Sequence, residues 1–341
     1  LVRALSIHAQ DFFILLARRR CMVEEQNYMR RAIRLAKQGI PWASPNPLVG
    51  AVIVKKGRVI GEGCHARCGG MHAERAALEA CTEDPAGATV YVTLEPCCHQ
   101  GRQPPCTQAL IESGVARVVV GSRDPNPKVA GRGIAQLRAA GVAVEKDFLR
   151  RECDALNPVF FHYITARTPY VALKYAMTAD GKLAARTGRS QWITGETARA
   201  HVHSLRSRYR AILVGVGTIL ADDPLLNCRM EGGRDPLRVV LDSRLRTPLS
   251  ARVCRTAQTQ KTIFVCAVEN AQKRAQLQAL GAEVLCLGGA DGRVDWVALM
   301  RELGAREIDS VLIEGGAEIQ YSALCAGVVQ RLYVYVGAML L

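Results

Sequence analysis

Apolar residues recur along the first half of the chain with two periods, one typical of strands and one typical of helices. Residues 48–63, LVGAVIVKKGRVIGEG, have β-branched residues on both sides of Lys56 and Gly57, which predicts a β-hairpin. Further strands are predicted at 88–94, 116–122 and 142–148, and helices at 28–38, 73–81, 107–113 and 133–140. This alternation predicts a layered α/β domain.

A second series of strands begins after residues 150–169, RRECDALNPVFFHYITARTP, which we interpret as a helix followed by a polar link that ends in proline. The strands of this series are predicted at 170–181, 210–217, 237–243, 261–267, 282–287, 309–316 and 331–338, with helices between several of them. We therefore expect two domains, at 22–167 and 168–341.

Residues 1–21 fit neither domain. Their apolar run comes before Arg18, Arg19 and Arg20, the reverse of the order in a secretory signal, and it is too short to span a bilayer. Because an amphipathic helical pattern opens at Met22, we expect residues 1–21 to be a non-native or disordered extension. Without a targeting segment, and with an odd number of cysteines, 13, the chain is expected to be cytoplasmic with reduced thiols.

The charge of the chain excludes some partners. Its 45 basic and 31 acidic side chains give a formal net charge of +14, but they form no block of five or six like charges. Aromatic residues make up only 5% of the chain, which leaves little for base stacking. We therefore expect a small anionic ligand, and neither nucleic acid nor a membrane.

A candidate metal site lies in the first domain. His72 begins a predicted helix, Cys97 follows a predicted strand, and Cys106 precedes the next helix. One imidazole and two thiolates would hold zinc and leave its fourth position open for water, as in catalytic zinc sites. Glu74, beside the ligands but not one of them, is placed to move protons.

Each part of this pattern is weak alone, since His-x-Glu and Pro-Cys pairs also occur on ordinary helices and loops. In this order they match the layout of zinc-dependent base deaminases. Nucleoside and nucleic-acid deaminases commonly have two residues between the cysteines, whereas eight separate Cys97 from Cys106 here, so Cys98 is interpreted as a bystander. Cys64 and Cys68, on either side of His65, form a rival site without a fourth partner nearby.

Several longer motifs then occur in a specific order. The segments SPNPLVGAVIV, GEGCHARCGGMHAE, VTLEPCCHQGRQPPCTQALIESGV and DPNPKVAGRG resemble the deaminase half of the bifunctional deaminase/reductases of riboflavin biosynthesis. The segments LKYAMTADGKLA, SQWITGE, LRSRYRAILVGVGTILADDPLLNCR, VVLDS and LIEGGAEI resemble the reductase half. The resemblance covers residues 25–341 and implies a cytidine-deaminase-like three-layer α/β domain followed by a dihydrofolate-reductase-like α/β domain.

For the first domain, the resemblance implies zinc-dependent deamination of a diaminopyrimidinone that carries a ribosylamino 5′-phosphate. Glu74 would be catalytic, and His72, Cys97 and Cys106 would bind Zn²⁺. Asn46 could present its amide to the ring, with an ordinary turn residue between two prolines as the less favoured alternative. The substrate-binding residues of this domain are expected to be Asn46, His99, Arg102, Asp124 and Asn126.

For the second domain, two glycine turns after strands, VGVGT and IEGGAE, suggest a dinucleotide phosphate site, although their spacing is not that of a Rossmann fingerprint. The resemblance implies reduction of the ribosyl group to ribityl by NADPH. Expected cofactor residues are Lys174, Ala176, Trp192, Thr218, Asp222, Gly315 and Gly316, and expected substrate residues are Ser190, Arg206, Leu226, Arg229 and Glu314.

The family normally continues beyond the last predicted strand, so the reductase domain is expected to be C-terminally truncated, with an unpaired edge. A homo-oligomer is also expected. Two alternatives remain open. A zinc deaminase of nucleosides or RNA with a non-catalytic second domain would use the same three ligands, and a zinc-stabilised module without activity would need a fourth protein ligand.

Overall fold

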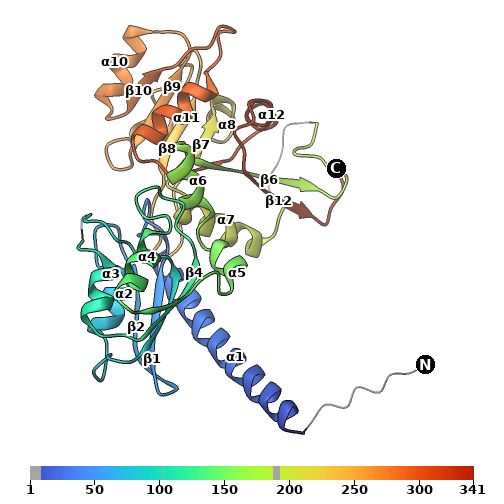
Figure 1. The fold of residues 1–341 in the computed structure, drawn as a ribbon. Coiled ribbons are helices and arrows are strands. Elements are labelled where there is room, and N and C mark those ends of the chain that lie inside the picture. Colours follow the sequence, from blue (N-terminus) through green and yellow to red (C-terminus); the bar gives the residue numbers. More distant parts are fainter. Residues whose placement is uncertain (1–8, 102, 187–192) are drawn as a thin grey trace. The chain divides into compact units, whose positions relative to one another are not determined.

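The computed structural model describes residues 9–101, 103–186 and 193–341, with the side chains of residues 9–21 excepted. The chain divides into two compact units between Phe161 and His162. Each unit is built around its own sheet (Figure 1). None of the described helices is both long enough and apolar enough to cross a membrane.

The described residues of the first unit form a five-stranded sheet in the order β2-β1-β3-β4-β5. Strands β1 and β3 pair antiparallel, and β3, β4 and β5 run parallel. The strands are β1 (Gly50–Lys55), β2 (Arg58–Cys64), β3 (Thr89–Leu94), β4 (Arg117–Ser122) and β5 (Ala143–Glu145). The predicted hairpin is present, since β1 and β2 are antiparallel neighbours joined at Lys56 and Gly57.

Helices cover both faces of this sheet (Figure 1). The long helix α1 packs Met29, Ala32 and Ile33 against Val52 and Val119 of the sheet. The opposite face carries α2, α3 and α4. The helices of this unit are α1 (Ala9–Ala36), the 3₁₀ turn η1 (Lys37–Gly39), α2 (Ala73–Glu79), α3 (Cys106–Glu112), α4 (Arg132–Ala139) and α5 (Arg150–Asp154).

Glycine allows α2 to lie close to the hairpin. A Cβ at Gly63 on β2 would come within 2.4 Å of the Ala77 backbone nitrogen and 2.6 Å of the Ala73 backbone oxygen. No larger residue fits this approach without moving the helix backbone. The beginning of α2, where His72 and Glu74 lie, is therefore held against the sheet.

The second unit has a seven-stranded sheet over its described residues, in the order β10-β9-β8-β7-β11-β6-β12. Its ladders are parallel. The strands are β6 (Tyr170–Thr178), β7 (Ala211–Gly215), β8 (Leu237–Leu241), β9 (Thr262–Cys266), β10 (Glu283–Cys286), β11 (Ser310–Ile313) and β12 (Arg331–Gly337). Consecutive apolar residues in the inner strands β7, β8, β9 and β11 match burial on both faces.

The two faces of this sheet carry separate cores. Trp296 and Leu299 of α11 pack against one face, and Val253 of α9 with Leu277 of α10 against the other. The helices are α7 (Glu196–Arg208), α8 (Val216–Asp222), α9 (Arg252–Arg255), α10 (Ala271–Ala279), α11 (Trp296–Ala305) and α12 (Ala317–Cys325). Strand β12 is an outer strand, and its Leu332, Val334 and Val336 are exposed.

Two sequence predictions need correction. The helix predicted at 28–38 is the end of α1, which begins at Ala9 and runs through Met22 without a break. The helix predicted within 150–169 is two helices, α5 and α6 (Pro158–Ala166), separated by residues 155–157 because proline lacks the backbone N–H and its ring restricts the preceding residue. The predicted identity of residues 1–21 as a non-native extension stays a prediction.

Candidate active sites

Three side chains of the first unit converge on a candidate metal centre. His72 is the N-cap of α2, Cys97 lies three residues after β3 ends at Leu94, and Cys106 is the first residue of α3. The His72 Nδ1 lies 3.5 Å from the Cys97 Sγ and 3.3 Å from the Cys106 Sγ. All three ligand atoms lie within 4.8 Å of one another.

These distances fit zinc. Tetrahedral bonds of about 2.0 Å to nitrogen and 2.3 Å to sulfur separate neighbouring ligand atoms by about 3.6 Å. The donor set also suits this ion, because thiolate and imidazole are the ligands of zinc sites. Among the described residues, no fourth His, Cys, Asp or Glu joins the cluster, which agrees with an open position.

The electrostatics of the centre favour a thiolate at Cys97. Hydrogen bonding from the Cys106 thiol, supported by His72 and the Cys106 backbone N–H, lowers the pKa of Cys97 to about 4 against the cost of burial. The same bond raises the pKa of Cys106, which keeps the proton in the metal-free protein. Cys97 is therefore a thiolate before a cation binds, whereas Cys106 must lose its proton on binding.

Glu74 lies in the first turn of α2 and is only 3% exposed. Burial first, and then the charge of Cys97, raises the pKa of its carboxyl to about 7. A carboxyl in this range can accept and release a proton near neutral pH, which is what a general acid/base requires. Glu74 is not among the clustered ligands.

Asn46 contacts His65, which in turn lies against the metal ligand His72. From the sequence, His65 was expected only as part of the rival cysteine site. The Asn46 Nδ2 lies 3.1 Å from the Nε2 of His65, whose Nδ1 lies 2.9 Å from the Met71 carbonyl oxygen. The rings of His65 and His72 meet edge-on, with centroids 5.3 Å apart. Burial lowers the pKa of His65. A histidine between glycine-rich turns gave no sequence signal for this contact.

The other predicted deaminase residues lie on loops after the strands. The His99 Nδ1 is buried and has no hydrogen-bond partner among the described residues, so it is available to a ligand. Asp124 is 7% exposed, and its Oδ1 accepts a hydrogen bond of 2.8 Å from the Asn126 backbone N–H. The Asn126 Oδ1 accepts in turn from the Lys128 N–H. Arg102 lies outside the described residues.

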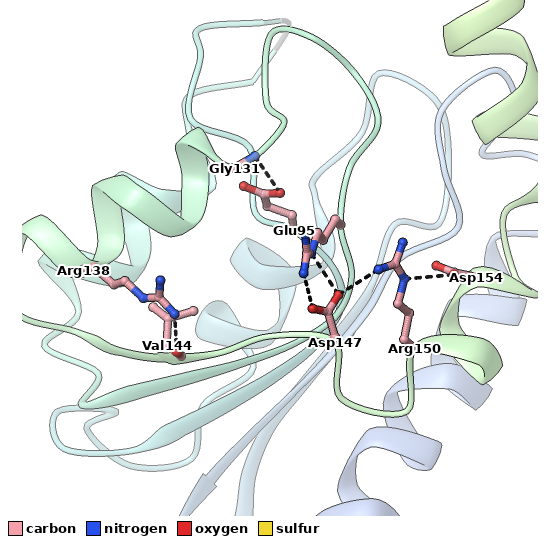
Figure 2. A network of polar contacts seen from close by, with 8 residues as sticks. Glu95, Gly131, Arg138, Val144, Asp147, Arg150 and Asp154 are labelled. Atoms are coloured by element: carbon pink, nitrogen blue, oxygen red, sulfur yellow. Dashed lines mark hydrogen bonds and ion pairs between the residues drawn. The ribbon is translucent and has the colours of Figure 1, made fainter.

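A polar network beside these loops fixes the ends of β3 and β4 (Figure 2). Glu95, next to Pro96 and Cys97, accepts hydrogen bonds from the backbone N–H groups of Gly131 and Ile134 at 3.1 and 3.2 Å. This contact ties the loop that carries Asp124 and Asn126 to the loop that carries Cys97.

The same figure shows how the end of β4 is held. Asp147 accepts hydrogen bonds from Arg123 and from Arg150, and Arg150 also donates to Asp154 (Figure 2). The Asp154 Oδ1 accepts from the Ser122 hydroxyl at 2.6 Å. Each of these ion pairs is partly exposed, so it contributes little to the free energy of unfolding. Their main effect is to fix the backbone next to Asp124.

In the second unit, a buried ion pair brings together residues predicted for substrate and cofactor. Arg206 of α7 donates to both oxygens of Glu314 at 2.8 and 2.9 Å, and its third nitrogen donates to the Asn227 carbonyl. Lys174 on β6 is half-buried and feels the charge of Glu314, and the burial it has lowers its pKa. Its Nζ lies 5.6 Å from the centre of the Tyr335 ring.

A cavity of about 660 Å³ opens at the carboxyl ends of the β7 and β8 strands. Thr218 and Gly316 line it, as predicted for the cofactor. Gly315 has φ 126°, and a Cβ there would lie 2.6 Å from the Thr218 hydroxyl, so glycine is required at this turn. Arg244, Arg246 and Arg293 also line the cavity.

The remaining predictions for this unit have mixed outcomes. Lys174, Ala176 and Asp222 are not among the described residues that line the cavity. Leu226 is buried, whereas Arg229 is exposed. Ser190 and Trp192 lie outside the described residues. These assignments stay predictions.

Comparison with known proteins identifies both units. Residues 22–122 match the cytidine and deoxycytidylate deaminase zinc-binding region, and residues 169–341 match the RibD C-terminal domain. The riboflavin biosynthesis protein RibD of Actinobacillus pleuropneumoniae is 54% identical over 91% of this chain and 83% of its own. That of Escherichia coli strain K12 is 40% identical over 94% of this chain and 89% of its own.

Solved structures agree. The diaminohydroxyphosphoribosylaminopyrimidine deaminase/5-amino-6-(5-phosphoribosylamino)uracil reductase of Thermotoga maritima superposes with a TM-score of 0.85 at 40% identity, covering 94% of this chain and 88% of that one. Acinetobacter baumannii RibD superposes with a TM-score of 0.83 at 39% identity, with the same coverage.

We predict that Cys97→Ser loses zinc and that Cys98→Ser keeps it. The Cys98 Sγ is not part of the ligand cluster and lies 3.8 Å from the Lys128 carbonyl oxygen, so its loss removes no ligand. Metal content of the purified proteins by atomic emission checks this, with the unmutated chain as reference. An equal loss of zinc in both variants would contradict the ligand assignment.

We also predict that Asp124→Asn stabilises the first unit above neutral pH. Burial, and then the charges of Glu95 and Cys97, raises the pKa of Asp124 from 3.8 to about 6, so its ionised form opposes folding. The shift corresponds to about 3 kcal/mol, present above pH 6 and relieved as the pH falls through 6 and the folded protein takes up the proton. Denaturant unfolding at pH 8 and pH 5 measures it.

Asp147→Asn is the matched control for this prediction. Hydrogen bonding to Arg123 lowers the pKa of Asp147, so its ionised form favours folding and its removal should destabilise at pH 8. The two aspartates should therefore respond with opposite signs at pH 8. If Asp124→Asn instead destabilises the protein at pH 8, the Asp124 carboxylate makes a favourable contact that outweighs the cost of its burial, and the prediction is wrong.

Proposed function

Since the chain belongs to the RibD family of riboflavin biosynthesis enzymes, we propose that its substrate is 2,5-diamino-6-(5-phosphoribosylamino)pyrimidin-4(3H)-one and that its reductant is NADPH. Family membership makes the chain a deaminase and a reductase. The resemblance inferred from the motifs is thereby confirmed, as are the cytidine-deaminase-like and dihydrofolate-reductase-like domains. The name of the Thermotoga maritima relative supports the substrate.

The observation that carries the deaminase proposal is the cluster of His72, Cys97 and Cys106 beside a buried Glu74. His72, Cys97 and Cys106 would hold a zinc ion, which would make a bound water more acidic and so a better nucleophile near neutral pH. Glu74 takes a proton from the attacking water and delivers it to the leaving amino group, so that a C–O bond replaces the C–N bond and ammonia departs. Its raised pKa suits both halves of this transfer.

The substrate is held by groups around this centre. We propose that the amide of Asn46 binds the pyrimidinone edge and that His99 uses its unpartnered Nδ1 on the substrate. Asp124 and Asn126, on the loop tied to Glu95, and Arg102 would bind the ribose and phosphate. The buried carboxylate of Asp124 is unfavourable for folding, which is the expected cost of a group kept for binding.

The reductase site is proposed around Glu314. Reduction transfers a hydride from the nicotinamide to the ribosyl group and adds a proton. The described hydrogen bonds of the Arg206 guanidinium are all to Glu314 and Asn227, so we assign it to holding Glu314 against the substrate. We therefore assign binding of the substrate phosphate to Arg229, which is exposed. Ser190, Leu226, Lys174, Ala176, Trp192, Asp222 and Gly315 keep their predicted roles as a proposal.

The preference for NADPH over NADH is supported by the arginines of the cavity. Arg244, Arg246 and Arg293 are exposed, and none of their guanidinium groups forms a hydrogen bond or ion pair with another described residue. Three unpaired guanidinium groups around one cavity favour a phosphate ligand. NADPH differs from NADH by such a group, the 2′-phosphate.

We retain the domain limits 22–167 and 168–341, close to the division after Phe161. A homo-oligomer and a cytoplasmic location are likewise proposals.

We predict that Glu74→Gln retains zinc and loses deamination, because glutamine keeps the shape of the side chain but cannot carry the proton. Loss of a positioned general acid/base lowers kcat by about 10²- to 10⁴-fold. The same variant should reduce supplied deaminated intermediate at the unmutated rate, since Glu74 lies wholly within the first unit. Ammonia release, NADPH oxidation and metal content give the three readouts. Loss of zinc would make Glu74 a structural support of the ligands.

For the cofactor, we predict that Arg244→Ala combined with Arg246→Ala weakens NADPH binding by about tenfold or more and changes NADH binding little, because charge-assisted hydrogen bonds contribute about 1.5–3 kcal/mol each. Calorimetric binding of adenosine 2′,5′-bisphosphate and of 5′-AMP tests the site without turnover. Arg255→Ala, an exposed arginine that does not line the cavity, is the control. Equal weakening of both nucleotides would contradict a 2′-phosphate site.

A further inference from the structure

We propose that His65 is a positioning residue for deamination, which fixes the direction in which the Asn46 side-chain amide faces the substrate. This inference rests on the proposed role of Asn46 in binding the pyrimidinone. It assigns a role to a histidine that neither binds the metal nor moves a proton in the reaction described above. The inference rests on a chain of two hydrogen bonds, in which the Asn46 amide donates to His65 and His65 donates to the Met71 carbonyl oxygen.

The geometry of this chain is well defined. His65 follows directly after β2 and is 2% exposed, and its backbone N–H donates to the Val49 carbonyl at 2.9 Å. Its Nδ1 lies 2.9 Å from the Met71 carbonyl oxygen, and its Nε2 lies 3.1 Å from the Asn46 Nδ2. The imidazole therefore has a partner at each ring nitrogen and little freedom to rotate.

The partners determine which nitrogen carries the hydrogen. A carbonyl oxygen can only accept, so the Nδ1 of His65 must donate to Met71. In a neutral imidazole the other nitrogen is then an acceptor, so the Nε2 accepts from the amide nitrogen of Asn46. A reversed amide would turn the Asn46 oxygen toward the lone pair of the Nε2, which is repulsive. The chain therefore favours one of the two amide orientations.

This selection matters because the two ends of an asparagine amide have opposite polarity. With the nitrogen engaged by His65, the Asn46 Oδ1 and its second N–H are left at fixed positions for the substrate. A pyrimidinone edge carries donors and acceptors in a set order, so a reversed amide would place like groups against each other. Pre-orientation removes the reversed state before binding, which favours affinity for the correctly placed ring.

The test separates this role from simple support of the fold. We would compare His65→Leu, Asn46→Ala and the double variant with the unmutated chain, measuring kcat and KM for deamination. His65→Leu should lower kcat/KM by about tenfold, corresponding to loss of about 1.4 kcal/mol. Because His65 acts through Asn46, the double variant should be no worse than Asn46→Ala alone. Multiplicative losses would overturn the proposal.

Controls identify a variant that has merely lost its structure. His65→Gln places a side-chain oxygen where it can accept from Asn46, and should recover most of the activity lost in His65→Leu. Zinc content and reduction of supplied intermediate should be unchanged in all variants. Failure of the glutamine variant to recover activity, with zinc retained, would also overturn the proposal.

The design distinguishes failure of this inference from failure of the proposed substrate role. If Asn46→Ala deaminates normally, Asn46 does not bind the ring and the proposed function of this residue falls with the inference. If Asn46→Ala is impaired and His65→Leu is not, the substrate role stands and His65 does not position the amide.

Discussion

The convergence of His72, Cys97 and Cys106 is the constraint on which the deaminase domain depends. The first and last ligands are 34 residues apart in the chain, yet their ligand atoms lie 3.3 Å apart. Two helices must begin, and one strand must end, at the same place for this to happen. The glycines of β2 serve this constraint, because they let α2 approach the sheet closely enough to bring His72 to the end of β3.

The same constraint explains why polar contacts gather at this edge of the sheet. The loops after β3 and β4 lack ladder partners, so their positions depend on side chains such as Glu95, which binds the backbone of Gly131 and Ile134. Burying these contacts costs little free energy of folding, because they satisfy backbone donors at the start of α4 that would otherwise be unpaired. The groups that do oppose folding, Glu74 and Asp124, are the ones assigned to chemistry and binding.

Much of this arrangement could be predicted from the sequence. Strand periodicity located the hairpin of β1 and β2, and the order of His72, Glu74, Cys97 and Cys106 located the metal centre, because metal ligands are restricted to a few residue types at strand and helix ends. The break between α5 and α6 was missed even though Pro158 marks it, because the apolar pattern continues across it. The contact of His65 with Asn46 could not be predicted, since it depends on the loop before β1 meeting the loop between β2 and α2 in space.

The reductase domain contains a buried carboxylate, Glu314, whose pKa shifts in the opposite direction to that of Glu74. In the deaminase, the carboxyl of Glu74 is buried without a cationic side chain bonded to it among the described contacts, and its pKa rises. Burial also raises the pKa of Glu314, but the hydrogen bonds and charge of Arg206, together with the charge of Lys174, outweigh burial and hold it below its ordinary value. Glu314 is thus kept ionised at neutral pH, whereas Glu74 is poised between its two forms. A carboxylate that stays ionised suits recognition of a polyhydroxylated substrate, whereas a carboxyl near its titration point suits proton transfer. The presence of a bonded arginine at Glu314 and its absence at Glu74 therefore agree with the roles proposed for the two residues.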